Sequence, residues 1–100
     1  MDKISKISEI TYQDIADYLR LTELSEDDIN TLKNLIDISK QFISKYTGHT
    51  IEELDDYQDF VIVVFILCQD IWYNRSLYID NKNLNKVVET VLNMHAVNLL

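Results

Sequence analysis

Apolar side chains recur at steps of three and four over residues 26–47, which is the spacing of an amphipathic helix. The apolar positions are Ile29, Leu32, Leu35, Ile36, Phe42, Ile43 and Tyr46. The segment has a start signal, because Ser25 is a good N-cap and three acidic residues follow it, where the helix dipole favours negative charge. It also has a stop signal, because Gly48 stands just beyond the last turn, where a left-handed cap is common. We therefore expect one long helix over residues 26–47.

Residues 57–74 form the most apolar segment of the chain. Its β-branched residues favour a strand by propensity, but the apolar pattern continues through Trp72 and Tyr73 without a Gly or a Pro, and this length favours a helix. A helix that is apolar on every face must be covered on every side. Either it lies at the centre of a bundle, or another subunit covers part of it.

Two shorter segments, residues 12–20 and residues 84–96, also have helical spacing, and Asn83 is a candidate cap for the second. Residues 1–9 show no pattern and are expected to form a flexible N-terminal tail. The sequence therefore predicts an all-α fold, a small bundle of about four helices with the apolar third helix at its centre. We expect residues 10–100 to form a single helical domain.

Composition agrees with this fold class. The chain has 100 residues, of which 47% are hydrophobic, with one Gly and no Pro, so it lacks the turn residues of a many-stranded sandwich or barrel.

Cys68 is the single cysteine and we expect no signal segment, which together favour a reducing cytosol as the place of synthesis. The longest apolar run, Phe60 to Cys68, has nine residues, whereas a membrane-spanning helix needs about 20.

The net charge is strongly negative. Nine basic and 17 acidic residues give a formal charge of −8, with acids in excess in both halves of the chain. Proteins that bind nucleic acid phosphates without sequence preference, or anionic membrane surfaces, carry clustered Lys and Arg. We therefore expect neither kind of binding from this chain.

The residues that could carry chemistry do not form a recognisable set. Neither His49 nor His95 has a second His or Cys at metal-ligand spacing. His49 stands close to Glu52 and Glu53, which favours a solvated loop or a local contact between imidazole and carboxylate over a metal site. His95 has apolar neighbours and is expected to pack or to form a hydrogen bond, and Cys68 is expected to be a buried apolar residue.

The acidic stretch of residues 52–59 lacks the framework of a calcium-binding hand, so we expect a solvated acidic face. A single glycine excludes a Gly-rich phosphate loop. Because no nucleophile, base and orienting group can be assembled, we expect no enzymatic activity and no cofactor. Trp72, Tyr73 and Arg75 are residue types that anchor protein interfaces, although a core Trp and a surface Arg explain them equally well.

The order of these motifs resembles the small head–tail connector proteins of tailed bacteriophages. Three groups of residues carry the resemblance, which covers roughly residues 10–100. The first group is Tyr18, Leu19, Arg20 and Leu21 ahead of a long helix that opens with Ser25 and Asp28 and closes with Phe42, Ile43, Tyr46, Thr47 and Gly48. The second group is Trp72, Tyr73, Asn74 and Arg75, and the third is Leu92, Met94, His95, Val97, Asn98, Leu99 and Leu100. The chain departs from the family in lacking a proline ahead of the third helix and in placing Asn74 directly after Tyr73.

The resemblance implies a structural subunit, without enzymatic activity, that forms a ring beneath the portal vertex of the capsid. Such a ring joins the capsid to the tail and extends the channel through which DNA is packaged and ejected. The implied partners are other copies of this chain, the portal protein and the tail-side or stopper connector proteins, while DNA passes through without specific binding. The implied location is the head–tail interface of the virion, after synthesis in the cytoplasm of the bacterial host.

By position, the resemblance assigns ten residues to the subunit or portal interface. They are Trp72, Tyr73, Asn74, Arg75, Met94, His95, Val97, Asn98, Leu99 and Leu100. We further hypothesise that four acids, Asp55, Asp56, Asp59 and Asp80, line the lumen and repel DNA phosphates. The alternative function is a monomeric or dimeric helical adaptor that binds a host or regulatory protein through an apolar groove. Solution mass separates the two, because contacts that close head to tail make rings.

Overall fold

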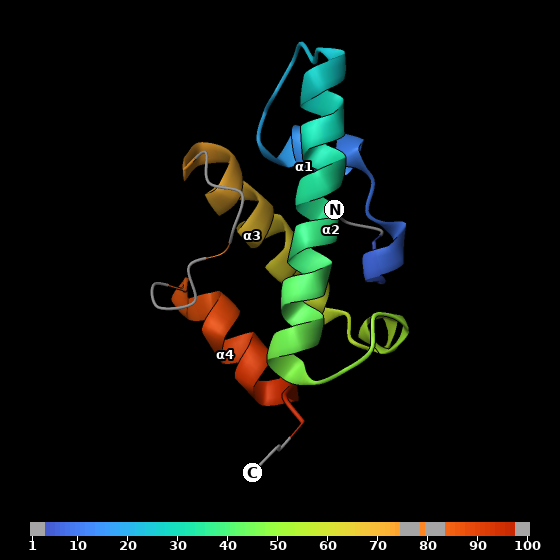
Figure 1. Cartoon of the computed structure of the whole chain (residues 1–100), viewed down its shortest axis with the longest axis vertical. Coiled ribbons are helices and arrows are strands. Elements are labelled where there is room, and N and C mark those ends of the chain that lie inside the picture. Colours follow the sequence, from blue (N-terminus) through green and yellow to red (C-terminus); the bar gives the residue numbers. More distant parts are fainter. Residues whose placement is uncertain (1–3, 75–78, 80–83, 98–100) are drawn as a thin grey trace.

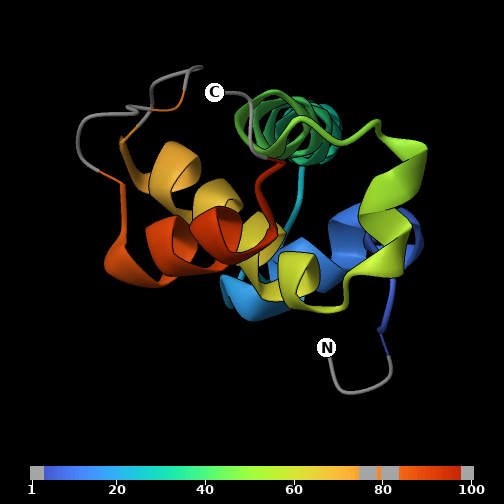
Figure 2. The ribbon, with the colours of Figure 1, turned by 90° about the horizontal axis from the view of Figure 1, so that it is seen from below.

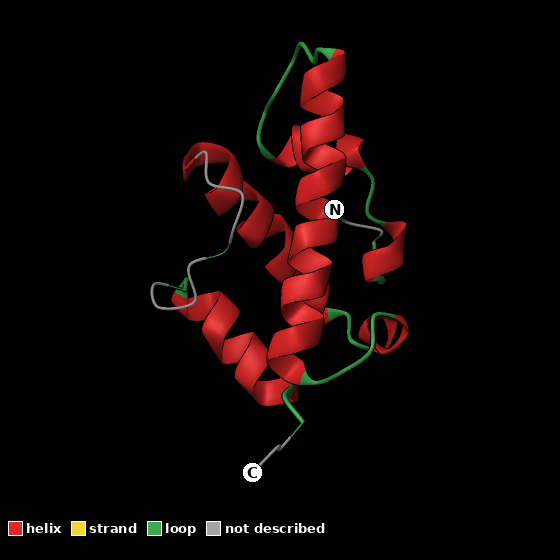
Figure 3. Ribbon diagram, in the orientation of Figure 1, coloured by secondary structure: helices red, strands yellow, loops and turns green. Residues whose placement is uncertain are grey.

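The structure, a computed structural model, describes residues 4–74, 79 and 84–97, and over these residues it is helical without a strand (Figures 1 and 3). In chain order the elements are the 3-10 helix η1 (Ile7–Glu9), α1 (Tyr12–Tyr18), α2 (Glu26–Thr47), the 3-10 helix η2 (Glu52–Asp56), α3 (Asp59–Asn74) and α4 (Lys86–His95). The predicted all-α bundle of about four helices is confirmed. Each α-helix begins and ends within two residues of the bounds that the sequence predicts.

The long helix α2 is fixed at both ends by its own sequence. The Asp28 backbone N–H donates to Ser25 Oγ at 3.1 Å, and the Ser25 N–H donates to Asp28 Oδ2 at the same distance, which satisfies two backbone donors reciprocally. At the other end, Gly48 adopts φ 82° and its N–H donates to Ser44 O at 2.9 Å. This left-handed conformation is least costly for a residue without a Cβ, so Gly48 ends the helix where the sequence predicts.

The short helix α1 ends in the same kind of turn, but without a glycine. Arg20 has φ 60°, its N–H donates to Asp17 O at 3.1 Å, and the Leu21 N–H donates to Ala16 O at 2.9 Å. These two bonds are the Schellman pattern. A side chain at φ 60° costs about 1 kcal/mol or more, so this turn stores strain that Gly48 avoids.

Seen along α2, the other three helices form a layer beneath it (Figure 2). The helix α3 packs against α1, α2, α4 and η1, which confirms its predicted central place. Eight of its side chains are buried: Phe60, Val61, Val63, Val64, Phe65, Leu67, Cys68 and Ile71. Burial raises the pKa of the Cys68 thiol to about 11, and its sulfur lies 3.6 Å from Ser39 Oγ on α2. Cys68 is therefore the buried residue that the sequence predicts.

The N-terminal segment differs from the prediction. Residues 1–9 are predicted to be a flexible tail, yet Ile7 is 1% exposed in the core and Ile10 is also buried. The Ser8 N–H donates to Asp55 Oδ1 at 2.9 Å, which ties η1 to η2. The prediction is wrong for Ile7–Glu9, because an apolar contact and an acceptor 47 residues away hold this turn. Residues 1–3 lie outside the described residues.

The helix α4 begins at Lys86 with Asn85 as its N-cap, whose Oδ1 accepts from the Val87 N–H at 2.7 Å. The candidate cap Asn83 lies outside the described residues. Val88 and Leu92 pack α4 into the core, and α4 runs down beside α3 to the C-terminal end of α2 (Figure 1). In the part of the chain that the structure describes, no helix has both the length and the apolar character to cross a membrane.

Candidate interaction site

The end of α4 is held against the start of α3 by a histidine. His95 Nε2 lies 3.0 Å from Asp59 Oδ2, and the imidazole packs on two rings, with centroid distances of 4.6 Å to Tyr57 and 5.3 Å to Phe60. His95 stands in the last turn of α4 and Asp59 in the first turn of α3. Each group therefore lies at the helix end whose dipole favours its charge when His95 is protonated. The predicted role of His95 in packing and hydrogen bonding is confirmed.

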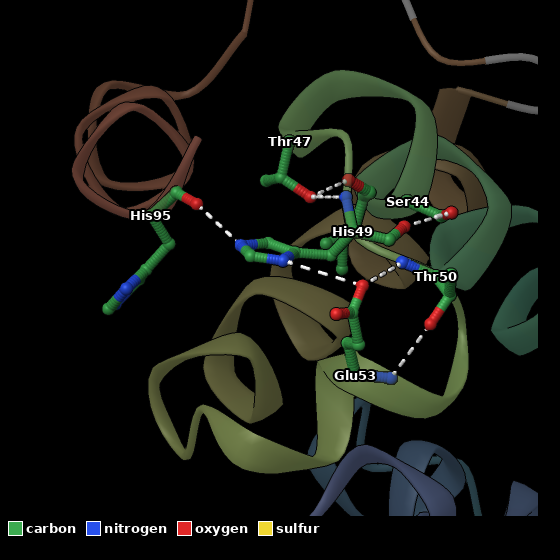
Figure 4. A network of polar contacts seen from close by, with 7 residues as sticks. Ser44, Thr47, His49, Thr50, Glu53 and His95 are labelled. Atoms are coloured by element: carbon green, nitrogen blue, oxygen red, sulfur yellow. Dashed lines mark hydrogen bonds and ion pairs between the residues drawn. The ribbon is translucent and has the colours of Figure 1, made fainter. Parts of the chain in front are cut away.

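A second histidine reaches the same place from the end of α2 (Figure 4). His49 Nε2 lies 2.8 Å from the backbone carbonyl oxygen of His95. A carbonyl oxygen only accepts, so Nε2 of His49 carries the proton and donates. His49 also packs on Tyr57, with ring centroids 5.0 Å apart, so the Tyr57 ring contacts both imidazoles. We name His49, Tyr57, Asp59 and His95 the C-terminal clasp.

The turn that carries His49 is braced by its own polar side chains (Figure 4). The Thr50 N–H donates to Glu53 Oε1 at 2.8 Å, and the Glu53 N–H donates to Thr50 Oγ1 at 3.2 Å. The hydrogen bond from the Thr50 backbone lowers the pKa of Glu53. His49 Nδ1 lies 3.8 Å from the same Glu53 oxygen, so the predicted contact between imidazole and carboxylate is present at ion-pair distance. The Ser44 hydroxyl donates to His49 O at 2.6 Å and fixes the backbone of the turn.

Two further bonds join α4 and the residues after it to α2. The Tyr46 hydroxyl donates to Asn93 Oδ1 at 2.9 Å, and the Val97 N–H donates to Thr47 O at 2.6 Å. Thr47 O belongs to the last turn of α2, where carbonyl groups lack helical partners, so Val97 satisfies one of them. The chain therefore leaves the described residues at the C-terminal end of α2.

The residues that the resemblance assigns to the interface differ in how far they are exposed. Tyr73, Met94 and Val97 are 61%, 67% and 43% exposed. Trp72 is half-buried against the core, and the His95 side chain contacts its own subunit through the clasp. Asn74 is exposed as the last residue of α3. The other assigned residues, Arg75, Asn98, Leu99 and Leu100, lie outside the described residues.

The candidate lumen acids have different environments. Asp55 accepts from Ser8; burial raises the pKa of this carboxyl, but the hydrogen bonds from Ser8 and the charges of Lys6 and Lys40 outweigh that effect, and the pKa of Asp55 is lowered. Asp59 bonds to His95, although its side chain is still 53% exposed. Asp56 is exposed on η2, and Asp80 lies outside the described residues. The structure thus uses Asp55 and Asp59 in contacts within the subunit.

Two features escape the sequence analysis. The clasp joins residues 36 and 46 positions apart, and no local spacing signals such a contact. The second feature is an outer apolar face of α4, where Val87 is 51% exposed and Met94 is 67% exposed. The spacing of Val87, Val91 and Met94 at steps of four and three is the sequence signal for this face. Among the described residues, no group of three or more His, Cys, Asp and Glu side chains is placed to hold a metal ion.

Comparison of the chain with protein-family models, with curated proteins and with solved structures found no match in any of the three.

Proposed function

We propose that this chain is a structural subunit of a head–tail connector of a tailed bacteriophage, which forms a ring beneath the portal vertex. In this role it joins the capsid to the tail, extends the DNA channel and catalyses no reaction. Its partners are neighbouring copies, the portal protein and the tail-side or stopper connector proteins, and its location is the virion. The proposal rests on the order of motifs over residues 10–100 and on one observation about the surface.

That observation is the position of the exposed apolar side chains. Tyr73, Val87, Met94 and Val97 are the exposed large hydrophobic residues of the described chain, and all of them lie in its last third. Three of the four belong to the motifs that carry the resemblance. Exposed large apolar side chains are the kind of surface that a partner protein covers. A subunit of an assembly needs such a surface, whereas a self-sufficient monomer does not.

The acidic surface fits a DNA channel better than a DNA-binding site. Asp56 is exposed, Asp59 is 53% exposed beside His95, and the pKa of Asp55 is lowered, against the effect of burial, by the hydrogen bonds from Ser8 and by the charges of Lys6 and Lys40. If these acids, together with Asp80, face the lumen, they repel phosphates and allow DNA to slide. An assembled ring with a basic lumen would remove this part of the proposal.

Light scattering tests the proposal. The chain is measured over a concentration series, alone and with its cognate portal protein, and the mass of each species is determined. We expect a large defined oligomer on the portal. The variant Met94→Gln exchanges an exposed apolar side chain for a polar one of similar length, and it should weaken assembly while the helical circular dichroism signal is unchanged. Asn34→Gln, an exposed position on α2, is the control and should assemble as the wild type does.

The alternative function is an adaptor for a host or regulatory protein. It predicts a chain that stays monomeric or dimeric and never binds the portal. That outcome would overturn the connector proposal, because a ring needs contacts between different faces of neighbouring copies.

A further inference from the structure

The helix α4 has two apolar faces. Val88 and Leu92 are fully buried in the core. Val87, Val91 and Met94 recur at steps of four and three, so they form a stripe along a different side of the same helix. Val87 and Met94 are more than half exposed and Val91 between them is half-buried. We call these three residues the α4 stripe, and the core of a single subunit leaves it largely uncovered.

Charge is distributed unevenly along the chain. Residues 1–70 contain 6 basic and 15 acidic residues, whereas residues 71–100 contain 3 basic and 2 acidic residues. The chain is therefore a strongly acidic body joined to a nearly neutral last third. On α4 itself, Lys86 and Glu89 are the charged residues apart from His95, and they cancel. The helix α4 itself therefore adds no net charge to repel a second copy of this acidic chain.

The α4 stripe of a second copy is also an apolar surface that the stripe of the first copy can contact. Outside residues 73–97, the described chain has no exposed large hydrophobic residue. Within residues 73–97, Tyr73 lies on α3 and Val97 follows α4, so the stripe is the helix face of the described chain that presents two exposed large apolar side chains. A second copy can therefore cover the stripe with its own stripe. A contact of a patch with itself is a two-fold contact, which closes at a dimer.

We propose that the α4 stripe pairs with the α4 stripe of a second copy, with the two helices antiparallel. In this arrangement Val87 lies opposite Met94 of the partner subunit, Val91 lies close to the two-fold axis, and the helix dipoles oppose one another. Three side chains on each copy make a contact below about 1,200 Å², in the range of weak and transient interfaces. The dimer therefore forms at high protein concentration and dissociates on dilution.

This dimer is a different assembly from the proposed ring. The ring needs contacts between different faces, whereas this contact joins two identical faces. Met94 belongs to both the α4 stripe and the surface proposed to dock in the connector. The pair consequently covers that surface in free subunits and has to open before they assemble.

Sedimentation velocity tests the pair in the absence of any portal protein. The full chain is measured from about 10 µM to about 1 mM, where weak dimers form. We expect a monomer–dimer equilibrium that tightens as NaCl rises from about 0.05 M to about 0.5 M, because salt screens the repulsion between two acidic bodies. A monomer throughout the series, an oligomer larger than a dimer, or a dimer that weakens with salt would overturn the proposal.

Variants locate the contact. Val87→Gln/Met94→Gln keeps the net charge and a good helix former at two exposed positions, and should weaken dimerisation at least about tenfold. Tyr73→Gln removes an exposed aromatic residue of α3, outside the stripe, and should dimerise as the wild type does. Equal weakening by the two variants would place the contact elsewhere and overturn the assignment to α4. Circular dichroism confirms that each variant is folded.

Cross-linking tests the orientation. An equimolar mixture of Val87→Cys and Met94→Cys should form disulfide-linked heterodimers under mild oxidation, faster than either variant alone. The native Cys68 is buried and does not take part. Equal cross-linking within Val87→Cys alone would mean parallel helices and contradict the proposal. Failure of the pair is seen without portal, and failure of the ring is seen only with it, so the two results are independent.

Discussion

His95 Nε2 lies 3.0 Å from Asp59 Oδ2, and this contact joins the last turn of α4 to the first turn of α3. It is one of several bonds that fasten residues 95–97 to the rest of the subunit, together with those from His49 to His95 O and from Val97 to Thr47 O. The clasp sets the direction in which the chain leaves α4. The exposed side chains of Met94 and Val97 are therefore held in place by contacts within the subunit.

Substitution of Asp59 should loosen the clasp. Asp59→Ala removes the acceptor of the His95 hydrogen bond and a favourable charge at the start of α3, and should lower the free energy of unfolding by about 1 kcal/mol. Asp56→Ala removes the same charge from an exposed neighbour on η2 and should change the free energy of unfolding by less than about 0.5 kcal/mol. Urea denaturation followed by circular dichroism measures both. Equal losses of unfolding free energy in the two variants would mean that the contact between Asp59 and His95 does not stabilise the fold.

The two left-handed turns should respond in opposite directions to substitution. Gly48→Ala places a Cβ at φ 82° and should destabilise the chain by about 1 kcal/mol. Arg20→Gly relieves the strain at φ 60° and should stabilise it by up to about 1 kcal/mol. Thermal denaturation of each variant and of the wild type measures both effects. A stabilising Gly48→Ala would show that the turn after α2 is not left-handed in solution.

Residues that act on their immediate neighbours make the helix bounds predictable from the sequence, whereas contacts between distant residues could not be predicted. The bounds of α2 follow from Ser25, Asp28 and Gly48, which act on their immediate neighbours. The 3-10 helix η1 was missed because its only apolar anchor, Ile7, stands among polar residues and is buried by elements far along the chain. The clasp was missed for the same reason, since His49, Asp59 and His95 meet only after the helices pack. Exposed Met94 was included as an interface residue through the resemblance, whereas the outer role of Val87 becomes visible only when α4 is seen on the core.

The contact between η1 and η2 should depend on acid pH. The pKa of Asp55 is lowered in the folded chain, so its contribution to stability is present above the pKa of the unfolded chain and is lost as the pH falls through the folded value. The wild type should therefore be more stable than Asp55→Asn at pH 6, and the difference should vanish as the pH falls well below about 4. Denaturation curves over this pH range measure it. A difference that grew as the pH fell would contradict the sign.

The thiol of Cys68 should report opening of the core. It is buried between α2 and α3, and burial raises its pKa to about 11, so both access and thiolate formation oppose its reaction. A thiol reagent at neutral pH should label the native chain more than about a hundredfold more slowly than the urea-unfolded chain. Mass spectrometry of the labelled fraction over time measures the rate. Rapid labelling of the native chain would mean that the packing of α3 on α2 is wrong.

The proposed function requires that this chain form a ring on a portal. Electron microscopy of the purified chain mixed with its cognate portal protein tests this assembly. We expect a ring coaxial with the portal, with the C-terminal end of the chain at a contact with the portal or a neighbouring copy. Portal particles that remain bare, with the chain free as a monomer or dimer, would contradict it.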